Sequence, residues 1–255
     1  MTGDPTTTRA RRTQEATAVA ESSVQWSVVV PLHDEADNVA PLVAELRSVL
    51  STLDGPYEVL LVDDGSRDDT RAIAQRVSLE WPQCRVVGFN RNQGQAAALL
   101  VGMQLARGRV IVTLDGDGQN VPADIPAMLA ALEGADLVVG VRQARDDSRL
   151  RLIMSRLANA IRSRFLRDGV SDTGCGLKVM RHEVVDAFIP IRTLYSFMPA
   201  LAVAAGHRVV ECPVQHRARR AGTAHYGLRT FAWRPLLDML GVWWFTRRRF
   251  AGRID

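Results

Sequence analysis

Short apolar runs alternate with longer amphipathic stretches from residue 26 to about residue 140. The apolar runs are rich in Val, Ile and Leu with little polar alternation, which is typical of strands that are covered on both faces. They lie at residues 26–31, 57–62, 85–89, 109–114 and 136–140. The stretches between them have helical spacing and lie at residues 38–53, 68–80, 93–106 and 122–132. Such repeated β–α units predict an α/β fold with a mostly parallel sheet and right-handed crossovers.

Two local signals place helix ends in this region. We expect Asp68 to cap the second helix, because an aspartate carboxylate accepts hydrogen bonds from the free N–H groups of a helical first turn. Gly55 and Pro56 follow the first predicted helix and end it.

Two stretches of the second half are amphipathic and rich in arginine. Residues 148–167 fit a helix with arginines beside an apolar face. That pattern occurs both in helices packed on a core and in helices lying on an anionic membrane. Residues 236–245 are apolar apart from Asp238 and include Trp243 and Trp244, with three arginines shortly after, which is typical of a membrane interface. The uncharged residues 193–206 fall short of the roughly 20 apolar residues of a spanning helix, so we expect peripheral association and no transmembrane span.

The charge of the chain is divided unevenly. The 255 residues carry a net charge of +4. Residues 1–141 hold 11 arginines against 19 acidic residues, a net charge of −8, and the remainder carries +12. A uniformly basic nucleic-acid-binding protein lacks this division, so no nucleic-acid partner is expected. The acidic part suits a metal ion, and the basic part suits an anion or an anionic surface.

Composition also divides the chain into three parts. Residues 1–24 have no apolar core and are expected to be a disordered tail, without a signal peptide. Residues 25–228 are predicted to form the α/β domain, and residues 229–255 an interfacial membrane-associating segment. The three cysteines are far apart without metal-ligand spacing, so we expect reduced thiols.

Polar residues follow four of the five predicted strands, at the carboxyl ends where ligands gather in parallel sheets. Those of chemical interest are His33, Asp34 and Glu35 after the first strand, Asp63, Asp64 and Ser66 after the second, Arg91 after the third, and Asp115, Asp117 and Gln119 after the fourth. Turns and helix capping explain one such loop. Four in succession indicate that these residues together form one ligand site.

Asp115 and Asp117 are two residues apart, so in an extended chain both carboxylates point to the same side. Paired hard oxygens suit Mg²⁺ or Mn²⁺, especially where substrate phosphates complete the coordination shell. An Asp-Gly turn without a metal remains the alternative. Neither a dinucleotide fingerprint nor a P-loop is present. A diphosphate would therefore be held by metal and arginine.

These motifs resemble the GT-A-fold, family 2 glycosyltransferases, and within them the polyprenyl-phosphate branch that includes dolichol-phosphate mannose synthase. Residues 31–35 resemble Pro-x-Tyr-Asn-Glu, with His33 and Asp34 in place of Tyr and Asn. Residues 63–70 match Asp-Asp-Gly-Ser-x-Asp-x-Thr, and residues 115–119 match Asp-x-Asp-x-Gln with glycines at both x positions. The resemblance implies a Rossmann-like three-layer fold of GT-A type.

The second half resembles the same branch. Arg142 stands in a Gly-x-Arg element, Arg151 and Ser155 match an Arg-x-x-x-Ser pair, and residues 172–178 resemble Asp-x-x-x-Gly-[Phe/Leu]-[Arg/Lys]. Residues 216–226 resemble Phe-x-x-Arg-x-x-Gly-x-Ser-Lys-Tyr, in which Arg219 and Gly222 match but Ala224 and His225 replace Ser and Lys. Arg217 and Arg220 are candidates to supply the missing charge.

The resemblance implies a role for each site residue. The implied donor-binding residues are Pro31, His33, Glu35, Asp63, Asp64, Ser66, Arg91, Asp115 and Asp117. The implied catalytic residues are Asp117, Gln119 and Arg142, the metal ligands Asp115 and Asp117, and the acceptor-phosphate ligands Arg151, Ser155 and Arg219.

The implied reaction is inverting transfer of one sugar to a polyprenyl phosphate at the cytoplasmic face of the membrane. Mannose is the favoured sugar and GDP-mannose the favoured donor, with UDP-sugars as the alternative. No clear general base is visible, and a monoalkyl phosphate needs none, because its second ionisation lies at about 6. Two alternatives stay open: a hydroxyl acceptor with Asp172 or His216 as base, and a catalytically silent nucleotide-binding module that docks on membranes.

Overall fold

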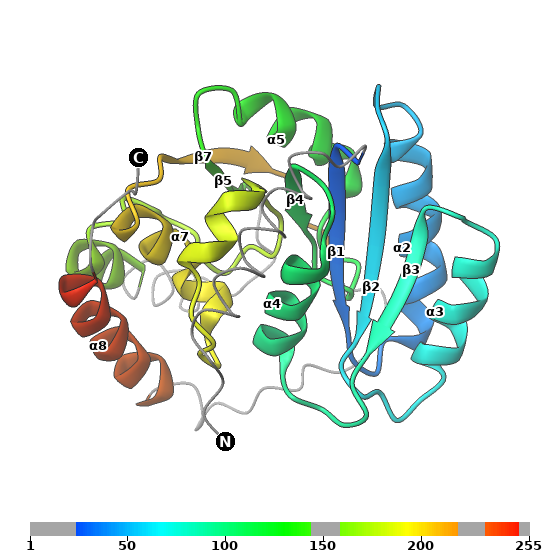
Figure 1. Ribbon diagram of the computed structural model, residues 1–255, viewed down its shortest axis with the longest axis horizontal. Helices are drawn as coiled ribbons and strands as arrows, with labels where there is room; N and C mark the ends of the chain where they lie inside the picture. The colour runs from blue at the N-terminus through cyan, green and yellow to red at the C-terminus, as the bar shows by residue number, and fades with distance from the viewer. Residues whose placement is uncertain (1–23, 144–158, 219–232, 250–255) are drawn as a thin grey trace, which may run out of the picture.

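The computed structural model describes residues 24–143, 159–218 and 233–249. It contains a central seven-stranded sheet with helices on both faces (Figure 1). The strands are β1 Trp26–Leu32, β2 Tyr57–Asp63, β3 Cys84–Gly88, β4 Val110–Thr113, β5 Leu137–Arg142, β6 Lys178–Arg181 and β7 Val209–Val214. The helices are α2 Ala36–Leu50, α3 Thr70–Leu79, α4 Gln95–Leu105, η1 Pro122–Asp124, α5 Ile125–Ala131, η2 His182–Ala187, α7 Leu194–Ala204 and α8 Trp233–Arg248, and residues 159–166 are also helical.

The strand order is β3-β2-β1-β4-β6-β5-β7. Every neighbouring pair is parallel except those of β6, which runs antiparallel to both β4 and β5. The prediction of a mostly parallel α/β sheet is therefore confirmed. Each of the five predicted strands is present, and β6 and β7 come from the second half of the chain.

Both faces of the central strands are apolar because each face is covered by helices. Val28 and Val30 of β1 pack into the core beneath α2, while Val29 between them packs into the opposite core beneath α4. Successive strand residues point to opposite faces, so a strand buried on both sides has to be apolar at every position. This explains the uninterrupted Val, Ile and Leu runs that identified the strands.

The prediction that Asp68 caps the second helix is wrong in position. The helix begins at Thr70 and its N-cap residue is Asp69. The Asp68 carboxylate instead accepts hydrogen bonds from the Thr70 backbone N–H at 2.9 Å and from Ala36 N–H at 3.2 Å. Asp68 therefore joins the starts of α2 and α3, because one carboxylate serves a donor from each helix.

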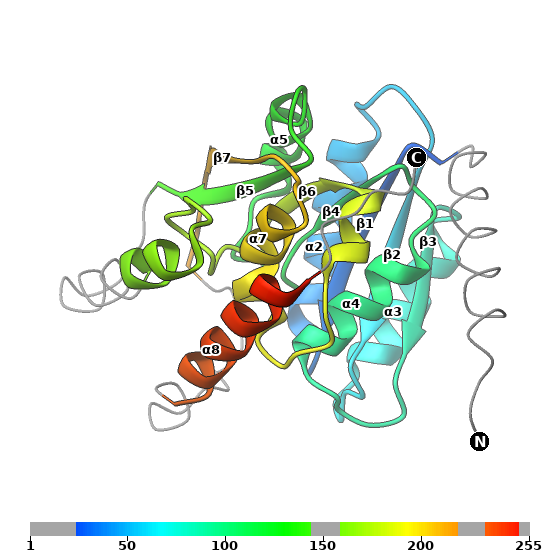
Figure 2. The ribbon, with the colours of Figure 1, turned by 60° about the vertical axis from the view of Figure 1, so that its left-hand side comes forward.

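Helix α8 packs on the side of the domain beside α7 (Figure 2). Val242 is fully buried there, Asp238 accepts a hydrogen bond from the Thr193 hydroxyl at 2.6 Å, and the rings of Trp243 and Phe165 stack with centroids 5.6 Å apart. Of the stretch predicted as an arginine-bordered helix, only the part from residue 159 onward is described. Among the described residues, no helix combines the length and apolar character needed to cross a membrane.

The three cysteines are free thiols, as expected. Burial raises the pKa of Cys84 to about 12 and that of Cys175 to about 11. The predicted tail and the predicted boundary at residue 228 lie outside the described residues.

Candidate functional site

The loops that follow β1 and β2 are bonded to each other at the carboxyl edge of the sheet. The Asp34 N–H donates to the Ser66 hydroxyl at 3.1 Å, and the Glu35 N–H donates to the Thr70 hydroxyl at 2.7 Å. Asp34 adopts a positive φ of 53°, and its carboxylate lies 3.5 Å from the His33 Nε2 atom. The first two predicted motifs therefore form one continuous surface.

Asp64 fastens the loop that follows β3. Its side chain is buried, and its two carboxylate oxygens accept hydrogen bonds from the backbone N–H groups of Gln93 at 2.7 Å and Gly94 at 2.8 Å. A Cβ on Gly65 would lie 2.4 Å from the Arg91 carbonyl carbon, so glycine permits this close approach. The predicted donor residue Asp64 thus shapes the loop that carries Arg91.

Asp63 is fully buried at the end of β2. One carboxylate oxygen accepts a hydrogen bond from the Ser66 N–H at 3.2 Å. The other has no hydrogen-bond partner among the described residues and lies 3.8 Å from the Arg71 Nε atom. A buried carboxylate oxygen without a hydrogen-bond donor is unusual, because leaving it unsatisfied is unfavourable.

Asp115 lies two residues after β4 and is partly buried. Its Oδ1 atom accepts a hydrogen bond from Gln95 Nε2 at 2.7 Å, and its backbone N–H donates to Asn120 Oδ1 at 3.1 Å. Burial, followed by the charge of Asp117, raises the pKa of Asp115 to about 6. The sequence analysis missed Gln95, since a glutamine at the first position of a helix carries no signal of its partner.

The residues present fit a divalent cation. Asp115 and Asp117 supply hard carboxylate oxygens, which Mg²⁺ and Mn²⁺ prefer. Burial and mutual repulsion oppose the ionised form of Asp115, and a bound cation would relieve both effects. Asp117 remains partly exposed, and its Oδ1 atom accepts a hydrogen bond from the Gln119 N–H at 3.0 Å.

Two positively charged side chains, Arg142 and Lys178, act on Asp115. The Arg142 guanidinium donates two hydrogen bonds to Asp172, both at 2.7 Å. Lys178, on β6, is buried, and its ammonium donates to the Cys175 carbonyl. Burial lowers the pKa of Lys178. Arg142 and Lys178 both favour ionised Asp115, so the site balances burial against nearby positive charge.

The loop carrying Asp117 pairs with the segment that follows β7. Arg217 N–H donates to the Gln119 carbonyl at 3.1 Å, and Arg217 Nε donates to the Gly118 carbonyl at 2.7 Å. The same guanidinium forms an ion pair with Glu45 at 2.6 Å. Arg217 was a candidate to supply charge to the acceptor, but the structure directs its side chain to the Gly118 carbonyl and to Glu45.

The predicted acceptor ligands Arg151, Ser155 and Arg219 lie outside the described residues. Their role, like the other residue roles implied by resemblance, stays a prediction. Pro31 is buried in β1, and Arg142 acts on Asp115 as described above.

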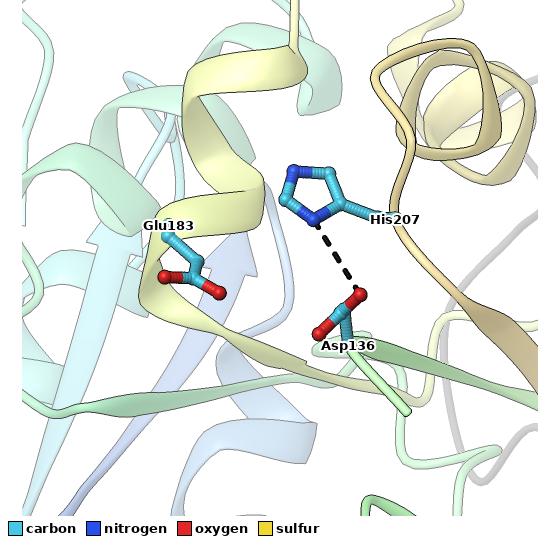
Figure 3. Close-up of side chains that lie close together, drawn as sticks. All are labelled: Asp136, Glu183 and His207. Atoms are coloured by element: carbon cyan, nitrogen blue, oxygen red, sulfur yellow. Dashed lines mark ion pairs between the residues drawn. The ribbon is translucent and has the colours of Figure 1, made fainter. Parts of the chain in front are cut away.

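A second group of potential metal ligands lies at the opposite edge of the sheet. Asp136, Glu183 and His207 offer ligand atoms within 4.8 Å of one another (Figure 3). Asp136 directly precedes β5, His207 lies two residues before β7, and Glu183 follows antiparallel β6. Asp136 forms ion pairs with His207 and with Arg181, each at 3.6 Å. Asp136 is therefore already paired with basic side chains, and the group lies away from Asp115 and Asp117.

The architecture is shared with known sugar-transferring enzymes. Glucosyl-3-phosphoglycerate synthase from Mycobacterium tuberculosis, in complex with Mn²⁺, uridine diphosphate and glucosyl-3-phosphoglycerate, superposes with a TM-score of 0.60. The alignment covers 91% of this chain and 79% of that one at 19% identity. Mannosyl-3-phosphoglycerate synthase from Rubrobacter xylanophilus gives a TM-score of 0.67 over 94% of this chain and 80% of that one, at 15% identity. These similarities establish a GT-A-like fold.

Residues 27–188 match the Glycosyl transferase family 2, and the chain belongs to that family. It is 40% identical over 232 residues to the dodecaprenyl-phosphate galacturonate synthase of Rhizobium johnstonii, covering 88% of this chain and 68% of that protein. It is 38% identical over 202 residues to the undecaprenyl-phosphate 4-deoxy-4-formamido-L-arabinose transferase of Klebsiella pneumoniae, covering 78% of this chain and 62% of that protein. The chain thus spans about two thirds of the length of these relatives, and the predicted resemblance is confirmed.

Proposed function

We propose that this protein transfers a single sugar from a nucleotide-diphosphate sugar to the phosphate of a polyprenyl phosphate at the cytoplasmic face of the membrane. The observation that carries the proposal is the Asp115–Asp117 pair, whose intervening Gly116 packs against Pro31 and Leu32 at the start of the loop that joins β1 to the loop of β2. The names of the two relatives, both of which refer to polyprenyl phosphates, support the acceptor class.

The donor would lie along the joined loops. The residues proposed to contact the nucleoside of the donor are Pro31, His33, Glu35, Asp63, Asp64, Ser66 and Arg91. Asp115 and Asp117 would hold Mg²⁺ or Mn²⁺, which when bound supplies positive charge to a leaving diphosphate. Gln119 and Arg142 would lie near the sugar or the phosphates. Inversion by a single in-line displacement follows from the resemblance to the family.

A phosphate acceptor agrees with the chemistry of the described residues. Asp172, the candidate base for a hydroxyl acceptor, already accepts two charge-assisted hydrogen bonds from Arg142. A carboxylate held in this way by a guanidinium is a poor proton acceptor. An acceptor phosphate is already ionised and needs only cations to hold it. Arg151, Ser155 and Arg219 are the proposed ligands.

Helix α8 is the proposed contact with the membrane. Its outward side exposes Leu237, Leu240 and Trp244, spaced three and four residues apart so that they share one helical face. The Arg248 guanidinium lies over the Trp244 ring, 5.2 Å from its centroid. An exposed apolar stripe that ends in tryptophan and arginine suits the headgroup region of an anionic bilayer.

The identity of the sugar is left to experiment. Neither named relative is a mannose transferase, so the sequence-based preference for GDP-mannose gains no support from them. A donor panel should include GDP-mannose together with UDP-linked neutral, acidic and amino sugars.

The test is transfer of label from each donor to polyprenyl phosphate in vesicles, followed by solvent extraction of the lipid. We expect one donor to label the lipid, Asp117→Asn to abolish labelling, and the exposed control Asp186→Asn to retain it. The absence of labelled lipid with every donor, or full activity of Asp117→Asn, would contradict the proposal. Turnover without lipid would indicate a hydroxyl acceptor, and vesicle co-sedimentation without turnover would indicate a silent docking module.

A further inference from the structure

We propose that Arg217, anchored by Glu45, is a positioning residue that fixes the loop carrying Asp117 and Gln119. The inference rests on the proposed function, in which that loop holds the metal. It concerns a side chain at an unspecified position of the motif at residues 216–226, so the family resemblance assigns it no role.

The loop needs support from outside because it contains two glycines. Gly116 packs so closely that an added Cβ would lie 2.6 Å from the Leu32 side chain and 2.7 Å from the Pro31 carbonyl oxygen. Gly118 has a positive φ of 73°. Glycine loses more conformational freedom on ordering than other residues, so an Asp-Gly-Asp-Gly loop holds its carboxylates in place only when other contacts restrain it.

The segment after β7 supplies these contacts. Arg217 N–H donates to the Gln119 carbonyl at 3.1 Å, and Gln119 Nε2 lies 3.5 Å from the Arg217 carbonyl oxygen. His216 forms an antiparallel bridge with Asn120. The backbone at Gln119 and Asn120 is thus paired with the extended segment at His216 and Arg217.

The Arg217 side chain extends this pairing. Its Nε donates to the Gly118 carbonyl at 2.7 Å, and another nitrogen of the same plane donates to Glu45 Oε2 at 2.6 Å. Glu45 lies 172 residues earlier, on α2, whose Leu42 and Leu46 are buried in the core. A planar guanidinium serves both acceptors at once, which a single ammonium group cannot do with the same geometry.

Hydrogen–deuterium exchange of the metal-free chain directly tests whether the contacts of Arg217 with Gly118 and Glu45 restrain the loop. We expect Arg217→Gln to speed exchange of the amides of residues 115–120 about tenfold, as loss of a charge-assisted hydrogen bond allows. Glu45→Gln should give a smaller increase, and Arg217→Lys an intermediate one. Arg181→Gln removes an ion pair at the opposite edge of the sheet and should leave this exchange unchanged.

The proposal also predicts that a less restrained loop binds the metal more weakly. Electron paramagnetic resonance can measure Mn²⁺ binding in the presence of uridine diphosphate without requiring turnover. The half-saturating Mn²⁺ concentration should rise about tenfold in Arg217→Gln, with partial recovery in Arg217→Lys and an unchanged thermal midpoint. Unchanged exchange of residues 115–120 in Arg217→Gln overturns the inference whatever the activity. Faster exchange with unaltered Mn²⁺ binding also overturns it. A wild-type chain that transfers no sugar contradicts the proposed function alone.

Discussion

The raised pKa of Asp115 predicts that this carboxylate contributes less to the stability of the metal-free protein as the pH rises. Burial and the neighbouring Asp117 move this pKa from 3.8 to about 6. The folded state therefore binds the proton more tightly than the unfolded state. The resulting stabilisation is complete below pH 3.8 and disappears as the pH rises to about 6, above which the ionised carboxylate opposes folding. The change in pKa corresponds to roughly 3 kcal/mol.

Asp115→Asn removes the charge while keeping an oxygen that accepts the hydrogen bond from Gln95. In chain treated with a chelator, we expect this substitution to stabilise folding by about 2–3 kcal/mol more at pH 7.5 than at pH 4. The assay is urea denaturation at both pH values, with Asp186→Asn as the exposed control. Mn²⁺ with uridine diphosphate should stabilise the wild type and not the variant, since binding to the folded state alone raises stability. An equal effect at both pH values would refute the argument.

Three further substitutions test the surroundings of the site. Gly176→Ala would place a Cβ 2.0 Å from Asp115 Oδ2. We therefore expect weaker Mn²⁺ binding and a free energy of unfolding, measured by urea denaturation, that is lower by about 1–3 kcal/mol. Wild-type values for both would show that Asp115 moves aside freely. Asp64→Asn turns an amide N–H₂ toward a backbone donor, and calorimetric titration with uridine diphosphate should show weaker binding, whereas unchanged affinity would separate this loop from the donor site. Leu46 lies on the buried face of α2, and Leu46→Ala should lower the free energy of unfolding by about 2–5 kcal/mol without altering donor affinity. A cost below about 1 kcal/mol would mean that the core collapses around the cavity.

Much of the fold was predictable because its strands are local and doubly covered. The run from Val28 to Val30 is apolar on both faces, so its pattern identifies a buried strand without knowledge of the neighbours. Strand β6 was not predictable in the same way. It is four residues long, carries Lys178 and Arg181 at its ends, and pairs antiparallel between β4 and β5, so its place depends on partners distant in sequence.

The carboxylate pair was predictable because Asp115 and Asp117 follow a strand directly, at the edge where parallel sheets gather ligands. Their environment was not. Gln95 reaches Asp115 from the start of α4, and Arg142 pairs with Asp172, 30 residues later in the chain.

The sequence by itself determined the first five strands, the helices between them and the carboxylates that follow those strands, because these features depend on neighbours along the chain. Only the tertiary structure decided that Arg217 meets Glu45 and Gly118, and that Lys178 is buried near Asp115. Such contacts join residues tens to hundreds of positions apart. Their partners are selected by how the elements pack, and no periodicity in the chain records that choice.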